Sequence, residues 1–277
     1  MKNDATEHIS IQKISAGEIS ETEDKVAVEE PLEIQLAYST ATGRMQKNIV
    51  ITMRTPGNDE ELAAGFLFTE GIIKDNTSVH EIKHLPADNN RVLVTLKENI
   101  IPVIASTSRN FYSTSSCGIC GKSSIDAIRA VSQYSDKKDN IVIEANTFHG
   151  LQHQLKKQQE VFEDTGGIHA GALFDLSGNF IMLREDVGRH NALDKIIGAV
   201  LMKEQLPLTH CILLLSGRAS FELVQKAAMA GIKIIAAVGA PSSLAVQLAK
   251  ETNITLIGFL KNNRFNIYSG RERINSV

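Results

Sequence analysis

The sequence predicts an α/β protein of two domains, in which a small α+β unit precedes a larger domain of alternating strands and helices. After Cys211, short apolar runs alternate with stretches of helical periodicity, a pattern typical of a sheet covered by helices. A Ser, Thr and Gly-rich segment at 107–124 separates this region from an earlier group of strand patterns. The chain of 277 residues is long enough for both units. We therefore expect a flexible tail at 1–25, an α+β domain at 26–106 and an α/β domain at 107–277.

The first domain is predicted from apolar alternation and turn residues. Residues 1–25 mix charged and small polar residues with little periodicity, which indicates a loosely ordered tail or an irregular first strand. Alternating runs on both sides of Thr42-Gly43 indicate a hairpin. Pro56-Gly57-Asn58-Asp59 and the acidic residues after it are typical of a helix start. The expected elements are strands at 33–38, 47–54 and 91–96 and a helix that Gly71 ends.

The second domain is predicted to contain a mixed or parallel sheet. Ser177-Gly178-Asn179 between two apolar runs indicates a hairpin, and Gly166-Gly167 is suited to the end of the helix before it. The later alternation of strand and helix builds a sheet with helical cover. The expected helices are at 151–162, 193–201, 221–230 and 244–250, and the expected strands at 172–176, 180–184, 211–215, 232–238 and 254–260.

Composition narrows the class of protein and its compartment. The net charge of −3 argues against a nucleic-acid-binding protein, because phosphate contacts normally require a basic excess. The polar first 24 residues contain no apolar segment behind a basic start, and no stretch reaches the length of a membrane helix. We therefore expect a cytoplasmic protein, without membrane contact, whose cysteines stay reduced.

The segment Ser115–Ser124 is the predicted chemical centre. It holds Cys117 and Cys120, two of the three cysteines, among serines and glycines typical of a surface loop. A reactive thiol needs exposure and a nearby positive charge, because the thiolate is the nucleophile. A helix predicted to begin after Ser123-Ser124, together with Lys122 and Arg109, would supply that charge.

Four interpretations of the cysteine pair compete. A structural zinc site wants four ligands, and the sequence has no second pair, so we expect no resident metal. A thioredoxin-like dithiol is the second interpretation, although no short βαβ unit surrounds the pair. A persulfide carrier is the third, in which one thiolate accepts a sulfur atom and presents it to an acceptor. Two buried cysteines in a tight turn are the fourth, which the polar surroundings disfavour.

Two later loops are candidates for an anionic ligand. The segments 216–220 and 239–243 each join a predicted strand to a helix, where free amides and the helix dipole favour phosphate or carboxylate. Simple helix capping explains the same residues equally well, since neither loop has a Walker A or GxGxxG pattern. The forked side chain of Arg218 would strengthen anion binding. The candidate residues in the first loop are Ser216, Gly217 and Arg218.

The segment 184–195 is dense in polar side chains. Asp186 or Glu185 is a candidate cap for the next helix, while Arg189 and His190 are candidates to face a ligand. We expect Asp194 and Lys195 on the outside of that helix. The remaining cysteine, Cys211, lies in an apolar run and is interpreted as a buried strand residue without chemistry.

Taken together, these segments resemble the formate dehydrogenase accessory sulfurtransferase family, the FdhD-like proteins. The resemblance spans about residues 30–268. It rests on the joint order of several short motifs, namely Leu62–Leu67 with Glu70–Ile73, Cys117–Gly121, Gly166–Ala170, Glu185–Lys195, Ser216–Arg218 and Gly258-Phe259.

The resemblance implies a sulfur carrier. Such a protein accepts persulfide sulfur from a cysteine desulfurase and passes it to the molybdenum or tungsten bis-guanine-dinucleotide pterin cofactor of formate dehydrogenase. It also implies that Cys117 carries the persulfide, that Cys120 assists, receives the sulfur in turn or protects it, and that members are dimers. The cofactor-binding segment of the family matches Phe259, Leu260, Lys261, Asn262, Asn263 and Arg264, which the residues alone equally describe as a hairpin turn.

The resemblance further implies that the C-terminal domain is similar in fold to cytidine deaminases. The cysteine pair precedes His169, however, and Gly171 stands where a catalytic Glu is expected, which argues against deamination. Two functions of other classes remain as alternatives. One is a binding module that chaperones the cofactor without chemistry, and the other is a thiol-disulfide oxidoreductase.

Overall fold

The computed structural model describes residues 5–86, 88–104, 134 and 139–275, and its centre is a six-stranded mixed sheet. The strand order is β13-β12-β11-β10-β8-β9. The inner strands β10, β11 and β12 are parallel, and the flanking pairs are antiparallel. The strands are β8 (His169–Asp175), β9 (Phe180–Asp186), β10 (Cys211–Leu215), β11 (Ile234–Ala237), β12 (Thr255–Lys261) and β13 (Arg264–Ser269).

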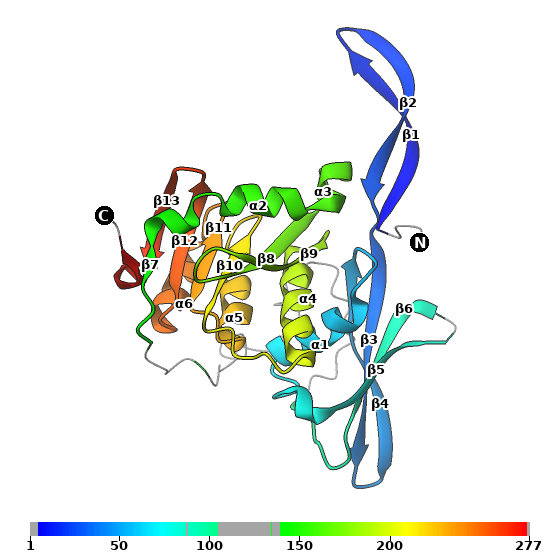
Figure 1. Ribbon diagram of the computed structural model, residues 1–277. Helices are drawn as coiled ribbons and strands as arrows, with labels where there is room; N and C mark the ends of the chain where they lie inside the picture. Colours follow the sequence, from blue (N-terminus) through cyan, green and yellow to red (C-terminus); the bar gives the residue numbers. More distant parts are fainter. Residues whose placement is uncertain (1–4, 87, 105–133, 135–138, 276–277) are drawn as a thin grey trace.

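Helices cover both faces of this sheet, as Figure 1 shows. One face packs against α4 (Arg189–Met202), α5 (Phe221–Met229) and α6 (Ser243–Glu251). The other face packs against α2 (Leu151–Gln158), which buries Leu151 and Leu155. The short α3 (Glu160–Thr165) follows α2, and Gly166 ends it in a left-handed conformation, as the glycine pair predicts. The prediction of a mixed sheet with helical cover is confirmed.

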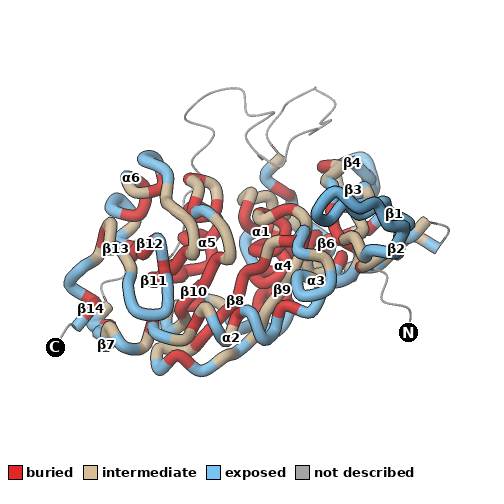
Figure 2. Tube along the Cα trace, turned by 90° about the horizontal axis from the view of Figure 1, so that it is seen from above, coloured by how far each residue is buried: buried red, intermediate tan, exposed pale blue. Residues whose placement is uncertain are grey.

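A second sheet of four strands, in the order β4-β3-β6-β5, packs on α1 (Asp59–Thr69). One hydrophobic cluster joins this sheet, α1, α4 and one face of the larger sheet, so the two sheets share a core, and a second cluster lies on the other face under α2. Figure 2 shows this buried region running through α1, α4 and the central strands. The strands are β3 (Glu30–Thr40), β4 (Gly43–Arg54), β5 (Val79–Leu85) and β6 (Asp88–Leu96).

The remaining elements are short. β7 (Ile143–Glu144) pairs in parallel with β14 (Ile274–Asn275). The 3₁₀ turns of the described residues are η1 (Asn76–Ser78), η3 (Ala145–Phe148) and η4 (Arg271–Arg273).

No helix among the described residues combines the length and apolar character needed to cross a membrane.

Helices α1 and α4 touch backbone to backbone at two glycines. A Cβ atom at Gly198 would overlap the carbonyl oxygen of Glu61, and one at Gly65 would overlap that of Asp194. Side chains at these positions would therefore push the helices apart. The glycine within the Leu62–Leu67 motif thus permits the close approach of α1 and α4.

Replacing Gly198 with alanine is expected to lower the free energy of unfolding by about 1–3 kcal/mol, because the added methyl group forces a backbone shift. Gly167→Ala is the matched control, since the nearest atom to its Cβ is 3.8 Å away. Urea titrations of both variants measure the difference. Equal midpoints for Gly198→Ala, Gly167→Ala and the unmodified chain would contradict the close helix contact.

The secondary structure differs from the expected elements at several places. A tail or irregular first strand was expected at 1–25, whereas residues 6–27 form an antiparallel hairpin of β1 (Thr6–Ser15) and β2 (Glu18–Ala27). The helix expected at 151–162 is two helices, because the backbone of Gln159 leaves the helical region and Glu185 accepts hydrogen bonds from the amides beyond it. The expected strands include neither β5 nor β13. The apolar residues of β5 recur every third position rather than every second, and the alternation in β13 is too short to stand out.

Candidate functional site

The loops at one edge of the six-stranded sheet form the candidate site. Strands β9, β10, β11 and β12 all end at this edge, and α4, α5 and α6 begin there. The caps of α5 and α6 are Ser220 and Ser242, and the Ser242 hydroxyl accepts a hydrogen bond from the Ala245 amide at 3.2 Å. The N-termini of three helices therefore direct free amides and positive dipole ends toward the same edge.

Hydrogen bonds tie these loops to one another and to β8. The Ser216 hydroxyl accepts from the Ala170 amide at 2.8 Å. The Gly239 amide donates to Gly217 O at 2.9 Å, and the Phe259 amide donates to Gly239 O at 3.1 Å. The segments that follow β10, β11 and the end of β12 are thus held side by side across the edge.

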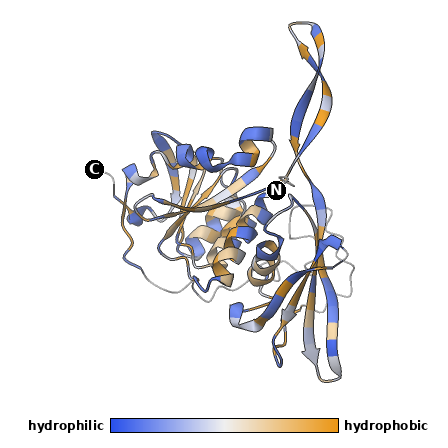
Figure 3. Cartoon of the chain, turned by 45° about the vertical axis from the view of Figure 1, so that its right-hand side comes forward, coloured by the Kyte–Doolittle hydropathy of each residue, from blue (hydrophilic) through white to orange (hydrophobic). Residues whose placement is uncertain are grey.

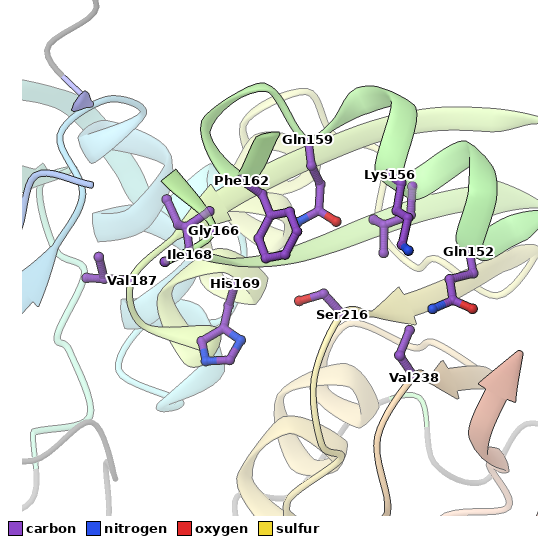
Figure 4. Close-up of a pocket in the computed structure, with 12 residues that line it drawn as sticks. Gln152, Lys156, Gln159, Phe162, Gly166, Ile168, His169, Val187, Ser216 and Val238 are labelled. Carbon is purple, nitrogen blue, oxygen red and sulfur yellow. The ribbon is translucent and has the colours of Figure 1, made fainter. Parts of the chain in front are cut away.

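A pocket of about 420 Å³ opens next to these loops, between the strand ends and helices α2 and α3. Figure 4 shows His169 and Ser216 on one side of it and the side chains of Phe162, Gln159 and Gln152 on the other. The lining residues are Gln152, Leu155, Lys156, Gln159, Phe162, Gly166, Gly167, Ile168, His169, Val187, Ser216 and Val238. The pocket thus combines an aromatic ring, amides and a histidine in one concave site.

Positive charge surrounds His169. Burial lowers its pKa below 6.5, and the charges of Arg189 and Arg218 lower it further, against the opposing effect of Asp186. The ring is therefore neutral at pH 7. The Arg189 Nε atom is buried and has no hydrogen-bond partner among the described residues. Since buried donors are normally paired, this atom is suited to a ligand oxygen at the same edge.

Most polar residues of the segment 184–195 hold the fold together. The Asp186 carboxylate accepts hydrogen bonds from the Gly188 amide at 2.8 Å and the Asn191 side chain at 3.0 Å. The Glu185 carboxylate accepts from the amides of Val161 and Phe162, both at 3.0 Å, and so fixes the start of α3. Glu185 therefore places Phe162 at the pocket.

Asp194 and Lys195 were predicted on the outer, solvent-facing side of α4. That prediction is wrong, because both are 1% exposed. Lys195 Nζ lies 2.8 Å from Asp186 Oδ2 and donates to Thr55 O at 2.9 Å. Asp194 Oδ2 lies 2.9 Å from Lys226 Nζ. Because α4 lies between α1 and the larger sheet, even its polar positions are buried.

His190, a predicted ligand residue, lies under the start of α5. Its Nε2 atom is 3.3 Å from Ser220 Oγ and 3.3 Å from Glu222 Oε2, and the residue is 5% exposed. It therefore joins the N-termini of α4 and α5. Among the residues predicted to face a ligand, Arg189, Ser216 and Arg218 lie near His169. His190 instead contacts other protein groups.

Comparisons with known proteins decide the family. A model of the FdhD/NarQ family matches residues 27–275. The chain belongs to the FdhD/NarQ family. It is 47% identical over 271 residues to the sulfur carrier protein FdhD of Mycolicibacterium paratuberculosis, covering 95% of this chain and 97% of that protein. It is 42% identical over 266 residues to the sulfur carrier protein FdhD of Sulfolobus acidocaldarius, covering 96% and 97%.

A solved structure agrees with this membership. It is a crystal structure from Desulfotalea psychrophila, provisionally assigned as a formate dehydrogenase accessory protein. The TM-score is 0.74 at 25% sequence identity, over 98% of this chain and 100% of that chain. The resemblance to the family inferred from the motifs is therefore confirmed.

The paired cysteines of this FdhD/NarQ member, Cys117 and Cys120, lie outside the residues that the structure describes. The third cysteine, Cys211, begins β10, which confirms the predicted strand position, but the residue is half-buried and not buried as expected. Burial raises the pKa of its thiol, and Asp175 raises it further. A raised pKa disfavours the thiolate, which makes Cys211 a poor nucleophile.

The segment expected to bind cofactor, 259–264, spans the end of β12 and the turn into β13. Lys261 pairs with Arg264, so Asn262 and Asn263 form the turn. Phe259 has a φ of 53° at a register irregularity and is 44% exposed beside the candidate edge. Leu260 is fully buried in the hydrophobic cluster under α2, so its side chain serves the core.

Sequence reasoning missed the helical wall of the pocket. The side chains of Gln152, Lys156 and Gln159 recur at intervals of four and three residues on α2 and just after it. That spacing places polar groups on one helical face, directly before the Gly166–Ala170 motif. This pattern was the available signal, although it equally describes a solvated helix face.

Proposed function

We propose that the chain is a sulfur carrier that accepts persulfide sulfur from a cysteine desulfurase and delivers it to the molybdenum or tungsten bis-guanine-dinucleotide pterin cofactor needed by formate dehydrogenase. The observation that carries this proposal is the near full-length similarity to proteins named sulfur carrier protein FdhD. The glycine-bracketed Cys117 and Cys120 pair supports it from the chemistry of thiols.

In the proposed loading step, the Cys117 thiolate attacks the outer sulfur of the donor persulfide. A sulfur–sulfur bond forms on Cys117 while the donor's sulfur–sulfur bond breaks, and the donor cysteine leaves as a thiolate. No net oxidation occurs, since one persulfide replaces another. We propose that Cys120 assists, by receiving the sulfur in turn or by protecting it.

The cofactor is proposed to bind as a substrate at the edge where the strands end, and the chain needs no resident metal. Its phosphate groups suit the three helix N-termini, the buried Arg189 Nε atom and Arg218. The remaining residues proposed to contact it are His190, Ser216, Gly217, Phe259, Lys261, Asn262, Asn263 and Arg264, and Leu260 through its backbone alone, because its side chain is buried in the core. Pterin and guanine rings suit the exposed ring of Phe259.

Replacing Arg218 with alanine is expected to weaken pyrophosphate binding about tenfold or more, because a charge-assisted hydrogen bond is lost. Calorimetric titration of the full-length chain with inorganic pyrophosphate measures the change. Arg271→Ala is the control, since Arg271 lies at the other end of β13. Equal affinities in the two variants and the unmodified chain would argue against an anion site at this edge.

Mass spectrometry tests the carrier function directly. After incubation with a cysteine desulfurase and cysteine, the Cys117 peptide should gain one sulfur atom. The Cys211 peptide should gain none, because its thiol has a raised pKa. A Cys117 peptide without added sulfur, when the desulfurase itself is loaded, would contradict the proposal.

Further parts of the proposal concern setting and organisation. We propose a cytoplasmic homodimer that contacts a desulfurase and formate dehydrogenase, and neither nucleic acid nor a membrane. We also propose two domains, at 26–106 and 107–277, the second similar in fold to cytidine deaminases. The support is the family resemblance together with the mixed sheet of the second half.

A further inference from the structure

The hairpin of β1 and β2, residues 6–27, extends away from the rest of the molecule as an arm. Figures 1 and 3 show it as a twisted two-stranded ribbon beyond the two sheets. Its ten cross-strand pairs run from Thr6 opposite Ala27 to Ser15 opposite Glu18. The family match begins at residue 27, so the arm lies outside the part that defines the family.

The arm has too little packing of its own to explain its regular structure. Most of its residues are exposed, and the paired Ile14 and Ile19 are 71% and 67% exposed. Its base is held by the Lys25–Asp164 ion pair at 2.9 Å and by contacts with α3. Isolated two-stranded hairpins are at best marginally stable in water. A further surface is therefore needed along the arm.

Each strand of the arm has one open edge, because β1 and β2 pair only with each other among the described strands. An open edge presents unpaired amides and carbonyls that can pair with another strand. The β2 edge is unsuited to its own copy, since four of its residues are acidic and only Lys25 is basic. Two β2 strands side by side would place like charges close together.

The sequence of β1 is self-complementary around Ser10. In an antiparallel pair of two β1 strands centred on Ser10, Glu7 stands opposite Lys13 of the second copy. Ile9 stands opposite Ile11 of the second copy in the same register. These positions are two residues apart, so they share one face of the ribbon. The twofold axis repeats each favourable pair, giving two ion pairs and two apolar pairs.

We propose that the β1 edge is an interface between two copies of this chain, which join their arms into one sheet in the order β2-β1-β1-β2. This inference specifies the interface of the proposed homodimer and goes beyond sulfur transfer. The proposed partner is a second copy because each charged or apolar residue on this face of β1 meets a complementary residue of an identical strand. Pairing would also extend the two-stranded ribbon to four strands, which exceeds the three strands that independent stability requires.

Charge exchange tests the register. Glu7→Lys and Lys13→Glu are each expected to raise the dissociation constant of the dimer about tenfold or more, because two attractive pairs become repulsive. The double variant should regain the original constant, and a mixture of the two single variants should form heterodimers. Analytical ultracentrifugation of the full-length chain measures the dissociation constants of the two single variants, the double variant and the mixture. Matched exchanges on β2, Glu21→Lys and Glu23→Lys, should leave the constant unchanged.

A cysteine at the twofold axis gives a second readout. Ser10→Cys should form a disulfide with its own copy under mild oxidation, since paired Cα atoms in such a ladder are about 4.5–5.5 Å apart. Ser20→Cys on β2 should not. The proposal would be overturned if the unmodified chain is a monomer, or if the charge exchanges leave the dissociation constant of the dimer unchanged. It would also be overturned if the β1 edge binds a different protein instead of a second copy. These outcomes are independent of sulfur loading at Cys117, so the two proposals fail separately.

Discussion

Replacing Cys117 with alanine is expected to abolish formate dehydrogenase activity in a host that lacks its own copy of this protein. The reason is that the carrier sulfur must bond to a thiolate, and alanine offers no sulfur. The expected activity is that of the host without any complementing gene. Formate oxidation in cell extracts, with equal amounts of each variant present, measures the effect.

Variants at the other two cysteines sharpen this comparison. Cys211→Ser should retain full activity, because the thiol is half-buried and its raised pKa disfavours the thiolate. Cys120→Ser separates the remaining functions, since dithiol exchange requires both paired cysteines equally. Retained activity in Cys120→Ser excludes a dithiol oxidoreductase. Retained activity in Cys117→Ala would instead identify a cofactor chaperone without sulfur chemistry.

Replacing Lys226 with methionine is expected to cost about 3–5 kcal/mol of folding free energy, because it leaves a buried carboxylate unpaired. Lys226 Nζ lies 2.9 Å from Asp194 Oδ2 and donates to Thr69 Oγ1 at 2.9 Å. Burial lowers the pKa of Lys226, but Asp194 and then Glu70 raise it by more, so the ammonium stays charged. The ion pair therefore joins α1, α4 and α5 in the core.

Urea unfolding measures this loss, with Lys203→Met as the control because Lys203 is exposed just after α4. The double variant Lys226→Met with Asp194→Asn should recover much of the loss, since it removes the fully buried Asp194 charge together with its partner. A Lys226→Met protein as stable as the control would show that the carboxylate finds another partner. Such a result would contradict the buried ion pair as a structural tie.

The predictable parts of the fold were those with local signals. The turn at Ser177-Gly178-Asn179 and the glycine after α3 both have the chemistry that their backbone conformations require. The alternation after Cys211 was equally informative, because parallel strands buried on both faces read as apolar runs. These features depend on neighbouring residues, so the sequence reveals them directly.

Long-range contacts explain what the sequence could not predict. Asp194 and Lys195 have the polar character of exposed helix residues, and only the packing of α1 over α4 buries them. The break between α2 and α3 at Gln159 depends on Glu185, which lies on strand β9. In the candidate site, the loop at Ser216 was predictable from strand-to-helix turns. Phe162 was not, because its place at the pocket results from that distant carboxylate.

The most direct test of the central claim follows one labelled sulfur atom through a single turnover. The chain is loaded with ³⁴S from labelled cysteine and a desulfurase, freed of both, and mixed with formate dehydrogenase that lacks its activating sulfur. We predict that the Cys117 peptide loses its label in proportion to the label and activity gained by the enzyme. Activation without loss of label from Cys117, or loss of label without activation, would contradict the account.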